Sequence, residues 1–133
     1  MHRLPWMDGL NVGVAALDEA HRDMFYLMGD LSEAVHAKSV RAALAMARDF
    51  VTKVEGHFKV EGEMMTRLGF PGAAVHQAKH ATTRDKVIDL ERALSDENLG
   101  LASTILGELE SVYFRELLNE DMILANYISA QAS

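Results

Sequence analysis

The chain of 133 residues contains no cysteine. This absence excludes disulfide bonds, iron–sulfur clusters and zinc sites that are built on thiolates. Any metal ion would therefore be held by nitrogen and oxygen ligands from histidine and carboxylate side chains. A chain without cysteine also fits a reducing compartment, and we expect a cytoplasmic protein.

Long apolar runs and basic residues are scarce as well. No apolar run approaches the ~18 residues needed to span a bilayer, and the N-terminal residues have no signal-peptide core. The 13 Lys and Arg residues against 20 Asp and Glu residues give a formal net charge of −7. Nucleic-acid binding usually requires a basic surface. We therefore expect a soluble protein with neither a membrane nor a nucleic-acid partner.

The pattern of breakers and apolar residues predicts four long helices, which the two prolines and nine glycines of the chain permit. Pro5 and Gly9 mark an irregular N-terminal arm at residues 1–16, in which Trp6 is the expected packing anchor. Because the links between helices are short, we expect an all-α, up-down-up-down four-helix bundle that forms one domain over residues 1–133. The helices are expected at about 18–37, 40–68, 71–94 and 97–128.

Each predicted helix carries an apolar stripe at spacings of three and four residues, as expected for a helix with one buried face. Asp18 and Ser39 are the expected N-caps of the first two helices, and Pro71 suits the first turn of the third. The predicted stripes are Leu17, His21, Met24, Phe25, Met28, Leu31 and Val35; Leu44, Ala47, Phe50, Val51, Val54, His57, Phe58, Glu61, Met64, Met65 and Leu68; His76, His80, Thr83, Val87, Leu90 and Leu94; and Leu101, Ile105, Leu109, Val112, Tyr113, Leu117, Ile123 and Leu124.

Two pairs of metal-ligating side chains lie on either side of a predicted turn. His57 and Glu61 are four residues apart, as are His76 and His80, so each pair occupies one helix face. The Gly69-Phe70-Pro71-Gly72 segment predicts a tight turn that makes the two helices antiparallel neighbours. Three imidazoles and a carboxylate that converge inside a bundle have the composition of a metal site.

Spacing alone leaves other roles open for the polar residues. A lone histidine on an apolar face is often a hydrogen-bonded core residue, and His21 fits either that role or a ligand. A carboxylate inside an apolar stripe, such as Glu61, is unfavourable unless it is paired or bound to metal. Glu116 continues the stripe of the fourth helix, whereas Asp121 lies five residues further, ~140° around a regular helix. Spacing favours a solvated acidic face for Glu116, Glu120 and Asp121.

The motifs taken together resemble the hemerythrin family, in particular its single-domain bacterial members. The resemblance covers nearly the whole chain and is specific, because agreement over so many positions does not arise by chance. The segments that carry it are Trp6, Leu10-Asn11-Val12-Gly13-Val14 and Leu17-Asp18-Glu19-Ala20-His21; His57-Phe58-x-x-Glu61 with Met65; and Gly69-Phe70-Pro71 with His76-x-x-x-His80.

The resemblance implies two non-haem iron ions in a diiron centre, bridged by an oxo or hydroxo group, that binds O2. The five-residue step to Asp121 then predicts that the fourth helix is over-wound or bulged there, a feature often found at functional sites. By the family pattern the ligands would be His21 and His57 on one iron, His76 and His80 on the other, and Glu61 and Asp121 as bridging carboxylates.

The sequence departs from the family pattern in the fourth helix. The family has a histidine ligand where this chain has Glu116, and an apolar residue of the O2 pocket where it has Tyr113. A carboxylate is a harder ligand that stabilises the ferric state. We expect Glu116 to bind the iron held by His76 and His80, although it could instead turn to solvent or pair with a cation. Tyr113 is expected to face the diiron pocket, or else to be a packing residue with its hydroxyl in solvent.

The sequence is therefore compatible with three functions. The first is a diiron protein that binds O2 as a carrier, store or sensor, with a ligand change that favours oxidation over reversible binding. The second is a diiron enzyme that consumes O2, peroxide or nitric oxide. The third is a bundle whose polar residues only specify packing. We expect the first, in a monomer whose partners are O2 or another small diatomic or peroxide ligand and an electron-donor protein.

Overall fold

The computed structural model describes residues 15–115 and 119–132 of the chain. The expected N-terminal arm at residues 1–16, with Trp6, lies almost wholly outside these ranges. Glu116 also lies outside the described residues, and so does the side chain of Tyr113. The expectations for these positions remain predictions.

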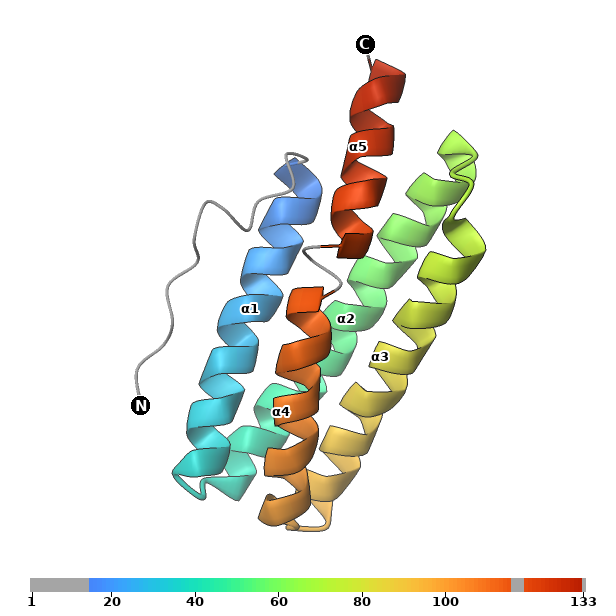
Figure 1. Ribbon diagram of the computed structural model, residues 1–133. Helices are drawn as coiled ribbons and strands as arrows, with labels where there is room; N and C mark the ends of the chain where they lie inside the picture. Colours follow the sequence, from blue (N-terminus) through green and yellow to red (C-terminus); the bar gives the residue numbers. More distant parts are fainter. Residues whose placement is uncertain (1–14, 116–118, 133) are drawn as a thin grey trace.

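The fold is all-helical within the described ranges, with no strand, as predicted. Figure 1 shows α1 to α4 side by side, and α5 beyond the end of α4. The α1–α2 and α3–α4 turns lie at one end of the bundle, and the α2–α3 turn lies at the other. Among the described helices, none is both long and apolar enough to cross a membrane. The helices are α1 (Ala15–His36), α2 (Val40–Leu68), α3 (Ala73–Ser95), α4 (Leu99–Arg115) and α5 (Asp121–Ala132).

The ends of the first and third helices differ from the prediction by a few residues. The boundaries predicted for α2 are correct, and Gly69 ends this helix with a left-handed backbone at φ 63°, a conformation that glycine adopts without a Cβ clash. Ser39 lies at the N-cap position of α2, but its side chain makes no capping hydrogen bond. Asp18 is not an N-cap, because α1 begins at Ala15. The third helix begins two residues after Pro71.

The fourth helix predicted at about 97–128 corresponds to two described helices, α4 and α5, and residues 119–120 directly before α5 have π-helical geometry. A π-helical turn adds a residue to the helical register, so the side chains that follow point in new directions. Asp121, the first residue of α5, is only 5% exposed. The solvated position that regular spacing favoured for Asp121 is therefore wrong, and the bulge that the family resemblance predicted before this residue is present.

The buried side chains follow most of the predicted stripes and form two apolar clusters. All predicted stripe residues of α1 and α3 are buried. Leu101 and Ile123 are exceptions, at 48% and 56% exposed. In α4 the buried face includes Ala102 and Ile105, so Leu101, one position before Ala102, lies beside that face. Ile123 comes after the π-helical residues 119–120, which shift the helical register and turn its side chain outward. The larger cluster fills the bundle, and the smaller one contains Leu17, Met65, Phe70, Leu124 and Ala125.

Tyr127 holds α5 to the turn between α2 and α3. Its hydroxyl donates a hydrogen bond to the carbonyl oxygen of Leu68 at 2.9 Å, and its ring meets that of Phe70 edge-on at 5.3 Å. We expect Tyr127→Phe to lower the free energy of unfolding by about 1 kcal/mol and to speed amide exchange in α5. Chemical denaturation and hydrogen exchange would measure this, with the exposed Ser129→Ala as control. Equal exchange in both variants would show that the bond does not hold α5.

Candidate metal centre

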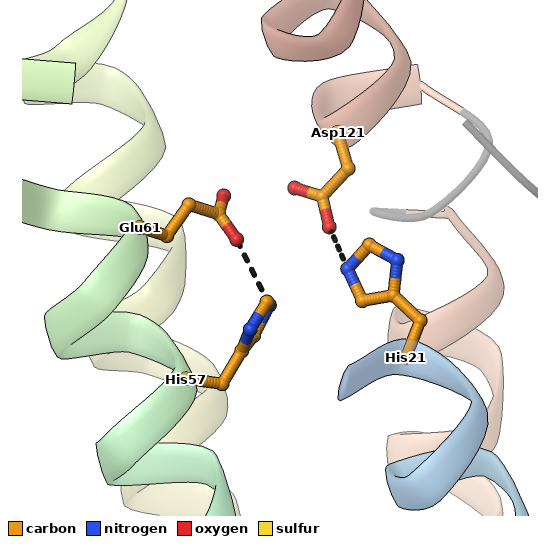
Figure 2. Close-up of side chains that lie close together, drawn as sticks. All are labelled: His21, His57, Glu61 and Asp121. Atoms are coloured by element: carbon orange, nitrogen blue, oxygen red, sulfur yellow. Dashed lines mark ion pairs between the residues drawn. The ribbon is translucent and has the colours of Figure 1, made fainter. Parts of the chain in front are cut away.

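Six metal-ligating side chains from four helices meet inside the bundle. α1 and α5 contribute one residue each, and α2 and α3 contribute two each. All six are buried, and Glu61 is fully inaccessible. Figure 2 shows four of them, with the carboxylates of Glu61 and Asp121 pointing towards each other. The six residues are His21, His57, Glu61, His76, His80 and Asp121.

The six residues form two groups that share the same two carboxylates. His21 and His57 complete one group, and His76 and His80 complete the other. Within each group, one ligand atom per residue lies within 4.8 Å of all the others. Two groups with common carboxylates could hold two neighbouring cations, with Glu61 and Asp121 between them. This is the grouping that the family resemblance implies.

Nitrogen and oxygen atoms face one another at short range. The distance from His21 Nε2 to Asp121 Oδ2 is 2.6 Å, and that from His57 Nε2 to Glu61 Oε2 is 2.9 Å. His76 Nε2 contacts Glu61 Oε1 and lies 3.0 Å from Asp121 Oδ1. His80 Nε2 is 3.3 Å from Glu61 Oε1. The Nε2 atoms of all four histidines are thus directed at the two carboxylates.

These contacts lack the alignment of hydrogen bonds. Both carboxylate oxygens of Glu61 and Oδ1 of Asp121 are buried without a hydrogen-bond partner among the described residues. Buried carboxylates are normally hydrogen-bonded or bound to a cation. Two ligands at right angles on one ion, each about 2.1 Å from it, lie about 3.0 Å apart. The spacing and the missing alignment both fit donor atoms that point at a shared cation, so the residues present suit two metal ions.

In the metal-free site, a proton on His76 offsets part of the negative charge of Glu61 and Asp121. Burial alone would raise the pKa of Glu61, but the imidazoles of His57, His76 and His80 hold it well below its ordinary value. Burial alone would lower the pKa of His76, but Asp121 and Glu61 raise it to about 10. Glu61 is therefore charged and His76 protonated at neutral pH. A metal ion must displace this proton in order to bind.

The raised pKa of His76 predicts how the stability of the metal-free protein depends on pH. The proton on His76 stabilises the folded state fully below the ordinary pKa of 6.5, and this contribution to the free energy of unfolding is lost as the pH rises through about 10. The reason is that between these two pH values only the folded state holds the proton. Glu61, Asp121 and His80 are the titratable groups that face it. Denaturation should show a free energy of unfolding that falls across this range, and His76→Gln should remove most of the slope. An unchanged slope in the variant would contradict the assignment.

A small cavity adjoins the group that contains His21 and His57. Its volume of about 20 Å³ leaves room for one molecule the size of water. Apart from the site residues and Thr83, the described side chains around it are apolar. A small, weakly polar molecule would therefore be accommodated beside the site. The lining residues are His21, Met24, Met28, Phe50, Val54, His57, Phe58, Thr83, Leu109 and Asp121.

The structure adds residues to the site that sequence reasoning did not single out. Phe58 stacks on the ring of His80, with centroids 3.8 Å apart and an interplanar angle of 2°. The position of Phe58 next to His57 in the sequence could have indicated that its ring packs at the site. Thr83 could have been noticed as a polar residue within the third stripe. The ion pair between Lys79 and Glu120 joins α3 to the residue before Asp121, and no local pattern predicts a pair so distant in sequence.

Comparison with known proteins gives a consistent result. The family model described as "Hemerythrin HHE cation binding domain" matches residues 12–128. The chain is similar to a bacteriohemerythrin of Stenotrophomonas maltophilia (strain R551-3), with 24% identity over 98% of this chain and 84% of the relative. It is also similar to bacteriohemerythrins of Pseudomonas aeruginosa (25% identity; 98% and 82%) and Ralstonia nicotianae (23% identity; 95% and 89%). No solved structure matches significantly. With most of its length matched by the family model, the chain belongs to the hemerythrin family.

Proposed function

We propose that the protein holds two iron ions in the bundle and binds O2 beside them, as a carrier, store or sensor. The observation that carries this proposal is the pair of buried four-residue groups that share Glu61 and Asp121. The hemerythrin domain binds a diiron centre, and O2 binding is consistent with the family. The iron ions, when bound, supply the electrons that O2 accepts.

Each of the two ions would have its own pair of histidine ligands, and the ions would share two carboxylates. We assign His21 and His57 to one ion and His76 and His80 to the other. Glu61 and Asp121 would bridge the two ions, and their negative charges would offset part of the cationic charge. Glu116 would add a further carboxylate to the ion held by His76 and His80, as the family pattern implies.

The cavity supports a small diatomic ligand. Its space of about 20 Å³ lies against His21, His57 and Asp121, so a molecule in it would be next to one of the two cation positions. The apolar side chains that line the rest of the cavity would exclude bulk water from that ligand. Tyr113 is proposed to face this pocket from α4.

The wider properties of the protein are also proposals. We propose an up-down-up-down bundle in which α4 and α5 count as one interrupted helix, within a single domain over residues 1–133. A monomer is supported by the large exposed apolar side chains, which lie singly on different helices; the described ones are Val60, Val75, Leu101 and Ile123. We further propose a cytoplasmic protein that receives electrons from a donor protein.

Anaerobic reconstitution with ferrous iron, followed by air, tests this function. We expect two irons per chain and an optical change on exposure to O2 that reverses under vacuum. A protein that takes up no iron would rule out the metal site and leave a bundle in which polar residues only specify packing. Metal analysis of the same sample would confirm the loading.

A second function is favoured by one observation, the carboxylate at position 116. An additional anionic ligand stabilises ferric over ferrous iron, which favours a diiron enzyme that consumes O2, peroxide or nitric oxide. Rapid irreversible oxidation, with turnover when a reductant is added, would support this function. Reversible O2 binding would exclude it as the main activity.

The variant Glu116→His restores the histidine that the family has at this position. We expect the variant to oxidise about tenfold more slowly in air, because a neutral imidazole stabilises the ferric state less than a carboxylate does. Stopped-flow spectroscopy of the reduced protein would measure the rate, with Glu116→Ala as the matched control. If both variants kept the metal content, spectrum and oxidation rate of the parent protein, Glu116 would not be a ligand.

A further inference from the structure

A broad groove lies on the surface between α2 and α3. It has a volume of about 850 Å³ and is open to solvent. Its rim carries charged side chains of both signs, including Lys59, Glu63 and Arg84. Phe58 and His80 also line this groove. The groove therefore brings solvent up to a histidine of the candidate metal centre and to the ring stacked on it.

Phe58 stands between this groove and the internal cavity. Among the described residues, it is the only one that lines both spaces. Its ring stacks on His80 with centroids 3.8 Å apart, and the centroid of His57 is 5.9 Å away. It thus lies between one histidine from each of the two groups. A molecule that moved from the groove to the cavity by the direct path would have to pass this ring.

The surroundings of Phe58 leave space for the ring to move outward. Phe58 is only partly buried, so one side of it already reaches the groove. Gly62, one helical turn further along α2, also lines the groove and has no side chain of its own, and the amide end of Gln77 lies against it. Ala81 of α3 is the other small residue in the lining. Rotation of the ring into the groove would break its stack on His80.

We propose that small ligands reach the site through the α2–α3 groove and that Phe58 controls their passage and limits their size. This inference rests on the proposed function, because it concerns access to the same site. The ring admits a molecule when it rotates outward and excludes it when stacked on His80. Phe58 is thus a positioning and selectivity residue and not a ligand.

A second path into the cavity is the main alternative. A groove of about 310 Å³ between α1 and α2 shares Met24 and His57 with the cavity. Met24 is 4% exposed and His57 is 9% exposed, so the two side chains that separate this groove from the cavity are almost inaccessible to solvent. His57 is also a proposed metal ligand and would be held in place by its ion. Phe58 is more exposed than either of these residues and is not a proposed ligand, which favours the α2–α3 route.

The kinetics of azide binding to the Co²⁺-loaded protein test this proposal. Azide is a small linear anion that ligates metal ions, and Co²⁺ reports its binding through the visible spectrum. A residue that controls passage changes the association and dissociation rates by the same factor and leaves Kd unchanged. We expect both rates to rise about tenfold in Phe58→Ala, a barrier change of about 1.4 kcal/mol, and to fall in Phe58→Trp.

Two more variants separate the routes. Ala81→Trp fills the groove without touching the cavity and should slow both rates. Val60→Trp fills the α1–α2 groove, also without touching the cavity, and should leave both rates near those of the parent protein. Slower rates in Val60→Trp with parent-like rates in the Phe58 and Ala81 variants would overturn the proposal, as would a change in Kd alone. Failure of the parent protein to take up Co²⁺ would instead refute the proposed metal site.

Discussion

Glu61→Ala should lose both metal ions. Glu61 is fully buried, and its oxygens face the imidazoles of both groups. Loss of a residue that only supports a ligand commonly lowers metal affinity about 10–100-fold. Loss of a carboxylate shared by two cation positions should lower the affinity by more than about 100-fold at each of them. Metal analysis after dialysis and calorimetric titration with Fe²⁺ under anaerobic conditions would measure the change.

Two further variants make this result specific. Glu55→Ala removes an exposed carboxylate from the same helix and should keep the metal content of the parent protein. Glu61→Gln keeps the shape of the side chain without its charge and should bind metal weakly. If Glu61→Ala retained two ions with an unchanged spectrum, the bridging role would be wrong, and the two groups would have to bind metal independently.

Removal of the metal should lower the melting temperature by about 10 °C or more. An ion that binds only the folded state stabilises it by about 4 kcal/mol when its concentration is about 1,000 times Kd, and each kcal/mol shifts the melting temperature of a chain of this size by a few degrees. Without the ion, both carboxylate oxygens of Glu61 and Oδ1 of Asp121 have no aligned donor among the described residues. Calorimetry of the reduced protein with and without a chelator would measure the shift.

The Glu61→Ala variant also serves as the control for this measurement. Because it should bind little metal, its melting temperature should hardly respond to the chelator. The protonated His76 keeps some attraction within the metal-free site, so we expect the metal-free protein to be folded and less stable, and not unfolded. Equal melting temperatures for the loaded and the metal-free parent protein would contradict a structural contribution from the metal.

Local patterns in the sequence determined much of this protein. The spacing of His57 and Glu61, and that of His76 and His80, placed each pair on one helix face because a helix repeats every 3.6 residues. The breaker residues between the pairs made α2 and α3 neighbours. The apolar stripes of α1 and α3 were predicted in full, and that of α1 included His21. Each of these features depends on residues close together in the chain, where helical geometry alone relates the side chains.

The family resemblance implied that Asp121 belongs to the site, but only the tertiary structure decided how this residue reaches it. A regular helix would turn this residue away from the core, but residues 119–120, directly before α5, have π-helical geometry. The ion pair of Lys79 with Glu120 and the hydrogen bond from Tyr127 to Leu68 hold α5 in place from distant parts of the chain. The side chain of Asp121 then meets His21 and His76. These contacts join residues tens of positions apart, so no local periodicity could predict them.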